Sequence, residues 1–356
     1  MNPSRNTTID VARGFIVFIM PAVHSLMLYS TKSVQTSWLG IIFGFLAEGP
    51  GAQLFMVLMG ISLTLGRPKT LRKVLIRSLL LLALGYLLNL TKLLIPYSLG
   101  MFPPALLQAY GIAPGVRGAL QLLTMGDILE FAAPAYLLTW MVYRLPHNRI
   151  WAVTGILAVT VVSPLVWDKQ SVIIVVQYLL QLIGGQPPRV FFPLFPWLVY
   201  PLFGLLLGCC MKQWKTRKLY RNMAFAGILL LVAGKALAHF EPAGWEGNFY
   251  RTGPAGTLYH LGIVTLWLCL CRLAVTKIRW NYFYQFLSWL SKHITSVYIL
   301  QWNVVCWLLP LFGFSRLGLL PSVCAIIITS AVSFGLSRFM DKLSVSYHPL
   351  KTISYE

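Results

Sequence analysis

Long apolar runs separated by short polar segments divide the whole chain. Each is near 20 residues, the length at which a helix crosses about 30 Å of hydrocarbon. The pattern predicts an all-α, polytopic transmembrane helix bundle of about ten spans, with residues 1–356 as one domain. We place the spans at 9–30, 38–66, 74–95, 119–143, 150–167, 190–211, 222–239, 257–275, 284–309 and 317–338.

One apolar segment, residues 171–186, is too short for a comfortable span. It runs into Gly184 and Gly185 and is followed by Pro187 and Pro188, which break helices. We expect an interfacial or re-entrant helix there, and an eleventh span is the alternative.

Composition supports a membrane protein. Of the residues, 57% are hydrophobic and 11% are charged, whereas a soluble domain carries about a quarter charged residues. The net charge of +20 would suggest a nucleic-acid partner in a soluble protein. Here the basic residues gather in short loops, mainly 67–77 and 212–221. The positive-inside rule therefore predicts that both termini lie in the cytoplasm. Because the spans are apolar, we expect membrane lipid around the bundle, and we expect no nucleic-acid partner.

The six cysteines all fall within expected spans, so we expect neither a disulfide framework nor a metal site. A buried cysteine usually serves as a small apolar side chain. The alternative is a thiol that briefly holds an acyl group, for which Cys306 is the first candidate.

Several spans carry polar groups in their outer halves. Counting helical rise from the cytoplasmic ends places five of these groups, and His24 with them, about 20–27 Å deep. Ionisable groups at such depth are costly unless they are paired or hydrated. We therefore expect a hydrated cavity that opens outward and contains His24. The five groups are Glu48, Asp127, Glu130, Lys235 and Gln301.

Arg13 and His24 share the first span. Eleven helical steps return the chain to within about 20° of the same face, and they separate the two residues by about 16 Å. An arginine near the cytoplasm suits phosphate, and a deep histidine, whose unperturbed pKa is near 6.5, suits a general base. Coenzyme A has a phosphate end and a long thin arm. In the structural alternative, Arg13 pairs with Asp10 and His24 is an interhelical hydrogen-bond donor.

Four segments resemble the transmembrane acyltransferase superfamily, which includes the acyltransferase-3 family and relatives of heparan-alpha-glucosaminide N-acetyltransferase. The first helix resembles it most specifically, because Arg13, ten residues and His24 fit the acyltransferase-3 signature. Residues 54–60, 192–197 and 296–300 agree with a Gly-ending second helix, a Pro-rich helix start and a late-span motif. In many relatives the late motif ends in a histidine, where this chain has Gln301. The role of that histidine cannot be carried over.

The resemblance implies transfer of an acyl group, acetyl by expectation, from cytoplasmic acyl-CoA to a hydroxyl or amine of an extracytoplasmic carbohydrate or glycolipid. The bacterial cytoplasmic (inner) membrane is the expected location. His24 is either a general base or the carrier of the acyl group. We assign catalytic roles also to Asp127 and Glu48, either of which could orient His24. Arg13 and Arg77 are expected to bind CoA, and Gln301 and Trp197 the acceptor.

Two other functions compete with acyl transfer. A transporter or flippase for an anionic lipid or glycan would suit polar groups at depth and a second span broken at Gly49-Pro50-Gly51. A membrane sensor or assembly partner without turnover is the third reading. The sequence leaves open the acceptor, the acyl chain length and whether the chain forms a homo-oligomer.

Overall fold

A computed structural model describes residues 6–242, 245 and 248–347, and within them the chain is helical apart from turns and two isolated β-bridges. The first half contains α1 (Thr7–Tyr29), α2 (Lys32–Gln35), α3 (Trp38–Leu46), the π-helix η1 (Ala47–Gly51), α4 (Ala52–Leu65), α5 (Leu71–Asn89), the π-helix η2 (Leu90–Leu94), α6 (Ile95–Ser98), α7 (Pro104–Ala109), α8 (Gly115–Leu123) and α9 (Ile128–Arg144). The second half contains α10 (Asn148–Val166), α11 (Ile174–Gly184), α12 (Leu194–Trp197), α13 (Val199–Gln213), α14 (Thr216–Leu237), α15 (Pro254–Lys277), α16 (Tyr282–Lys292), α17 (Ile294–Trp307), α18 (Leu309–Phe312) and α19 (Leu319–Tyr347).

The expected class, an all-α polytopic membrane bundle, is confirmed. Among the described residues, 8 helices are long and apolar enough to cross a membrane. They correspond to eight of the expected spans. The other two expected spans, 119–143 and 284–309, are each divided between two shorter helices.

Both divisions have a local cause. Asp127 has extended backbone angles and caps the start of α9, so the chain between α8 and α9 cannot continue as one helix. The remaining membrane helix, α9, has 17 residues. At the second division, His293 leaves helical geometry (φ −106°, ψ 21°) between α16 and α17. Apolar periodicity did not reveal either break.

The second span is continuous despite its Gly-Pro-Gly sequence. Residues Ala47–Gly51 form the π-helix η1, which joins α3 to α4 without a loop. Proline lacks the amide hydrogen that an α-helix requires, and a π-bulge accommodates this irregularity. Helix α11 has 11 residues and does not qualify as a span. An eleventh span is therefore not supported.

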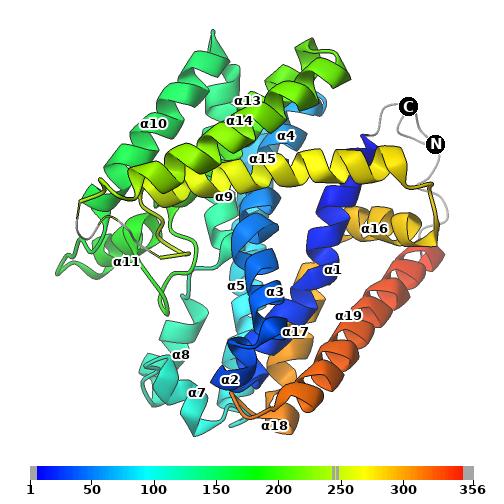
Figure 1. The fold of residues 1–356 in the computed structure, drawn as a ribbon. Helices are drawn as coiled ribbons and strands as arrows, with labels where there is room; N and C mark the ends of the chain where they lie inside the picture. Colours follow the sequence, from blue (N-terminus) through cyan, green and yellow to red (C-terminus); the bar gives the residue numbers. More distant parts are fainter. Residues whose placement is uncertain (1–5, 243–244, 246–247, 348–356) are drawn as a thin grey trace.

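Figure 1 shows several of the helix connections at two opposite ends of the bundle. The basic α4–α5 and α13–α14 connections lie together at the top of that view, while α2, α7, α8 and α18 lie at the bottom. This separation agrees with the charge pattern of the sequence. The assignment of the top to the cytoplasm remains a prediction.

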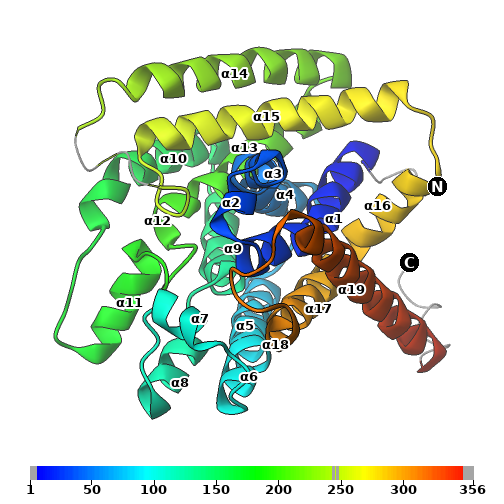
Figure 2. The same cartoon turned by 60° about the horizontal axis from the view of Figure 1, so that its bottom comes forward.

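Helix α1 forms the centre of one half of the bundle, where it packs against α16, α17 and α19. Helices α14 and α15 run side by side along one edge, as Figure 2 shows, and α15 also contacts α1. Helices α5 and α9 pair with each other on the other side of α1. The space between these groups contains the site.

Helices α4 and α13 cross closely because glycines face the crossing. A Cβ at Gly204 would lie 2.0 Å from the carbonyl oxygen of Val57, and one at Gly60 would lie 2.1 Å from that of Pro201. Gly208 continues the same face four residues after Gly204. Small residues at this spacing are typical of membrane helices whose backbones touch.

We expect Gly204→Val to destabilise the protein by about 3 kcal/mol or more, because overpacking must push the two helices apart. Gly335→Val on α19 is the matched control, since a Cβ there meets nothing within 4 Å. Thermal unfolding of both variants in detergent measures the difference. Equal melting temperatures would show that this crossing does not depend on its glycines.

Candidate functional site

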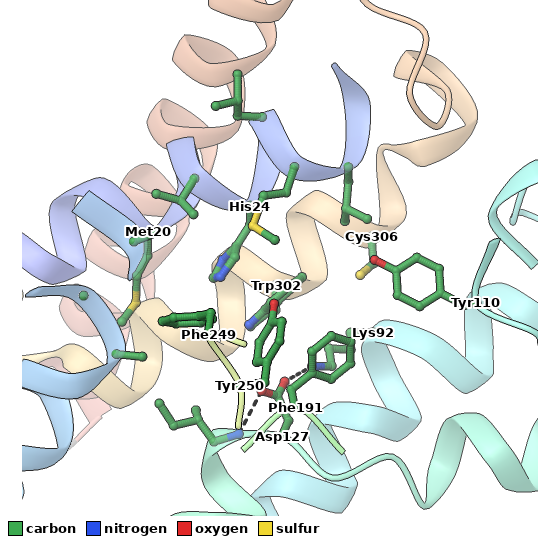
Figure 3. Close-up of a pocket in the computed structure, with 18 of the residues that line it drawn as sticks. Met20, His24, Lys92, Tyr110, Asp127, Phe191, Phe249, Tyr250, Trp302 and Cys306 are labelled. Atoms are coloured by element: carbon green, nitrogen blue, oxygen red, sulfur yellow. Dashed lines mark hydrogen bonds and ion pairs between the residues drawn. The ribbon is translucent and has the colours of Figure 1, made fainter. Parts of the chain in front are cut away.

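A cavity of about 440 Å³ opens within the bundle between α1, α3, η2, α9 and α17. Figure 3 shows its polar groups close together, with His24 from α1 and the Lys92–Asp127 pair on opposite sides of Trp302 in that view. Most other lining residues are apolar. The segments before α8 and before α15 both contribute, through Tyr110 and Tyr250 among others.

His24 is held by α17. Its Nδ1 lies 2.9 Å from Oε1 of Gln301, and its ring stacks on Trp302 with the centroids 3.9 Å apart. The amide Nε2 of Gln301 donates to the carbonyl oxygen of Tyr298, so the amide oxygen faces the histidine. Because an amide oxygen only accepts hydrogen bonds, this arrangement favours the tautomer with hydrogen on Nδ1. The lone pair then resides on Nε2.

Lys92 and Asp127 form a buried ion pair beside His24. Lys92 Nζ lies 2.5 Å from Asp127 Oδ2, and the two side chains are 4% and 11% exposed. The same ammonium group lies 4.5 Å from the centre of the Trp302 ring, which His24 also contacts. Trp302 thus contacts both a cation and the imidazole ring of His24.

The position of Asp127 is fixed by the start of α9. Its Oδ1 accepts from the backbone amide of Ile128 at 2.8 Å, and the backbone amide of Asp127 donates to Glu130 Oε2 at 3.1 Å. Together these contacts form a capping box. Asn89 at the end of α5 donates to Glu130 and to the carbonyl oxygen of Met125, which anchors the same turn. Contacts within α9 and from the end of α5 therefore hold the turn that carries Asp127.

A short outer segment, Phe249 and Tyr250, forms another wall of the cavity. The carbonyl oxygen of Tyr250 accepts from the indole of Trp197 at 2.7 Å. The next residue, Arg251, is bidentate to Asp168 at 2.9 and 3.2 Å and lies over Trp167. These contacts fix the segment on both sides. Burial raises the pKa of the Tyr250 hydroxyl, which keeps it a neutral donor.

Four of the expected site residues lie in or beside the cavity. His24, Asp127 and Glu48 line it, and Gln301 supports His24 from behind without lining the cavity. Among the described residues, the hydrogen-bond partner of His24 is Gln301, whereas the carboxylate of Asp127 bonds to Lys92. In the structure a neutral amide, and not a carboxylate, contacts His24 Nδ1, and the catalytic roles of Asp127 and Glu48 stay predictions.

The other three expected residues lie elsewhere. Arg13 donates to Oγ of Ser62 on α4 at 2.6 Å and does not line the cavity. Arg77 is exposed on α5. Trp197 is fully buried behind Phe249 and Tyr250, so it supports the cavity wall and does not line the cavity. Its contact with an acceptor stays a prediction.

Sequence reasoning missed Lys92 and Trp302. Lys92 could have been found, because it is an ionisable residue inside the apolar run 74–95. Trp302 carries no comparable signal, since aromatic residues are common throughout this chain. Its importance depends on the contact between α1, η2 and α17.

A comparison with models of known protein families identifies the family of this chain. The model of the heparan-alpha-glucosaminide N-acetyltransferase catalytic domain matches residues 5–240. The searches of curated proteins and of solved structures gave no match. The matched part contains His24, Lys92 and Asp127, and the chain beyond it supplies Gln301 and Trp302. Because the match covers well over half of the sequence and agrees with the signature of the first helix, the chain belongs to this family of membrane acetyltransferases.

Proposed function

We propose that the protein transfers an acetyl group from acetyl-CoA to an amine or hydroxyl of a sugar on the far side of the bacterial inner membrane, with His24 as general base. The observation that supports this most is the contact of Gln301 with His24 Nδ1, which leaves Nε2 free to accept a proton. The family supplies the acetyl donor and suggests a glucosaminide acceptor.

In the proposed step, the acceptor nitrogen or oxygen attacks the thioester carbonyl while His24 Nε2 takes its proton. The carbon–sulfur bond breaks, and the thiolate of CoA leaves. The proton then passes from His24 to that sulfur, so the enzyme returns to its starting state. Neutral histidine is required at the start, and the neutral Gln301 partner suits that requirement better than a carboxylate would.

Lys92 is proposed to stabilise the negative charge that develops on the thioester oxygen. Its ammonium group is buried in the cavity wall and held by Asp127 and Trp302. A fixed cation in a site of low dielectric needs no reorganisation during the reaction. Asp127 acts through Lys92, which makes it a positioning residue.

The donor is proposed to approach from the end of the bundle that carries the basic loops. Arg13 lies on that side of His24 along α1, and Arg77 lies near the same end on α5. Both remain candidates for contacts with CoA phosphates. Glu48 lines the cavity opening, where it can meet the amine of an arriving acceptor.

The direct test uses the purified protein in lipid vesicles with acetyl-CoA and methyl glucosaminide. We expect free CoA and N-acetylated sugar to appear in equal amounts, measured by chromatography and mass spectrometry. Accumulation of unmodified sugar inside the vesicles without release of CoA would instead identify a transporter. Release of CoA without acetylated sugar would exclude this acceptor.

A further inference from the structure

The chemistry of the cavity wall does not match a simple sugar. His24, Lys92 and Asp127 occupy one region, whereas residues such as Met20, Val23 and most others along the wall are apolar. A sugar hydroxyl buried against such a surface loses its hydrogen bonds to water without replacing them, which is unfavourable. Hydrocarbon fits the same surface well. The occupant is therefore expected to have a polar head and an apolar part.

The open edge of the cavity runs along α2, α3 and η1. Of the lining residues, Lys32 and Glu48 are exposed and mark the two ends of this edge, and Met27 on α1 is 48% exposed beside it. By contrast, the lining residues Phe102, Leu106 and Leu122, in α8 and the segment before it, are buried, and Leu107, Tyr110 and Ile112 in that segment are half-buried. The cavity thus opens sideways along a helix.

Helix α3 separates the cavity from the bilayer. Gly40 and Gly44 lie on its cavity side, one turn apart, while Ile41, Ile42 and Phe45 on the other side are exposed. A Cβ at Gly44 would meet nothing within 4 Å, so this glycine does not serve close helix packing. Its lack of a side chain leaves space along the opening.

We propose that the acceptor is a lipid-linked sugar, whose head group reaches His24 while its hydrocarbon tail leaves the cavity past Gly44 into the bilayer. The proposal rests on the acetyltransferase function proposed above and names the class of its acceptor. It explains why the wall is apolar, why the opening is lateral and why α3 has space on its inner side.

The test compares two acceptors with the same head group, methyl glucosaminide and dodecyl glucosaminide, in protein-containing vesicles with acetyl-CoA. We expect the wild-type protein to prefer the dodecyl acceptor at least tenfold in kcat/KM. Gly44→Phe should lower the dodecyl rate at least tenfold and leave the methyl rate within twofold. Because the dodecyl compound partitions equally into vesicles with either variant, the change between variants reports on the opening alone.

Gly335→Phe is the matched control, because that glycine is exposed on α19 and also has space for a side chain. It should leave both rates unchanged. An unchanged dodecyl rate in Gly44→Phe, or an equal loss with both acceptors, would overturn the proposed tail route. If dodecanoyl-CoA outperforms acetyl-CoA and Gly44→Phe removes that advantage, the opening holds the acyl chain of the donor. In each case acyl transfer itself continues, whereas failure of the proposed function would show no transfer with any pair.

Discussion

Replacing His24 with alanine is expected to lower the rate of acetyl transfer by about 10²–10⁴-fold, the usual contribution of a general base. Gln301→Leu should cause a smaller loss, because removal of one neutral hydrogen bond worth about 1 kcal/mol changes a rate roughly fivefold. Steady-state release of CoA with methyl glucosaminide measures both. The loss of rate should be larger for His24→Ala, because His24 faces the cavity whereas Gln301 only orients His24.

His260 provides the matched control for His24. It is a half-buried histidine on α15 that does not line the cavity. His260→Ala should keep wild-type turnover, and full activity in His24→Ala would exclude the catalytic role of His24. A single turnover without acceptor separates the two mechanisms. One equivalent of CoA released at once would identify His24 or another group as an acyl carrier, in place of the direct transfer proposed here.

Lys92→Met is expected to abolish activity and to destabilise the protein by about 3–5 kcal/mol, because it leaves the buried carboxylate of Asp127 without its cation. The variant therefore cannot separate a catalytic role from a structural one. Lys92→Met combined with Asp127→Asn removes both charges, and asparagine still caps α9. We expect this double variant to recover most of the stability and none of the activity.

Thermal unfolding and CoA release on the same samples give the two readouts. Lys235→Met is the control, since Lys235 is an exposed lysine near the end of membrane helix α14. That substitution should change neither stability nor turnover. If the stable double variant retains near-normal activity, Lys92 has no part in stabilising the thioester oxygen, and its pairing with Asp127 is only structural.

Much of the fold could be predicted because membrane helices are determined by local composition. Eight of the expected spans correspond to helices of suitable length, and the short segment at 171–186 contains a short helix. The breaks at Asp127 and His293 were missed because apolar residues continue on both sides of them. Such breaks depend on a capping side chain and on backbone angles, and the mean hydropathy of a long segment does not detect either.

The sequence predicted how deep each site residue lies along its own helix, but it did not predict the contacts between helices. Counting rise placed His24, Glu48 and Asp127 at similar depths, and all three line one cavity. The helical rotation between Arg13 and His24 predicted that both lie on one face of α1. In the structure Arg13 donates to Ser62 on α4 and does not line the cavity. Which groups face each other depends on how the helices pack, and one chain without aligned relatives contains no direct signal for that. The contact of Gln301 with His24 and the pairing of Lys92 with Asp127 are therefore seen only in the structure.

The hydrogen bonds around His24 also set the order in which the site can form during synthesis. Helix α1 precedes α17 and α19 in the chain, yet several polar contacts of α1 and its C-cap are with these later segments: His24 with Gln301, Ser25 with Thr329, and Ser30 with Ser322. The hydroxyl of Tyr29 likewise donates to the carbonyl oxygen of Val305. These contacts of α1 can therefore form only after α17 and α19 have been inserted into the membrane. The proposed site, which joins groups of α1, η2, α9 and α17, is therefore complete only after α17 has been inserted.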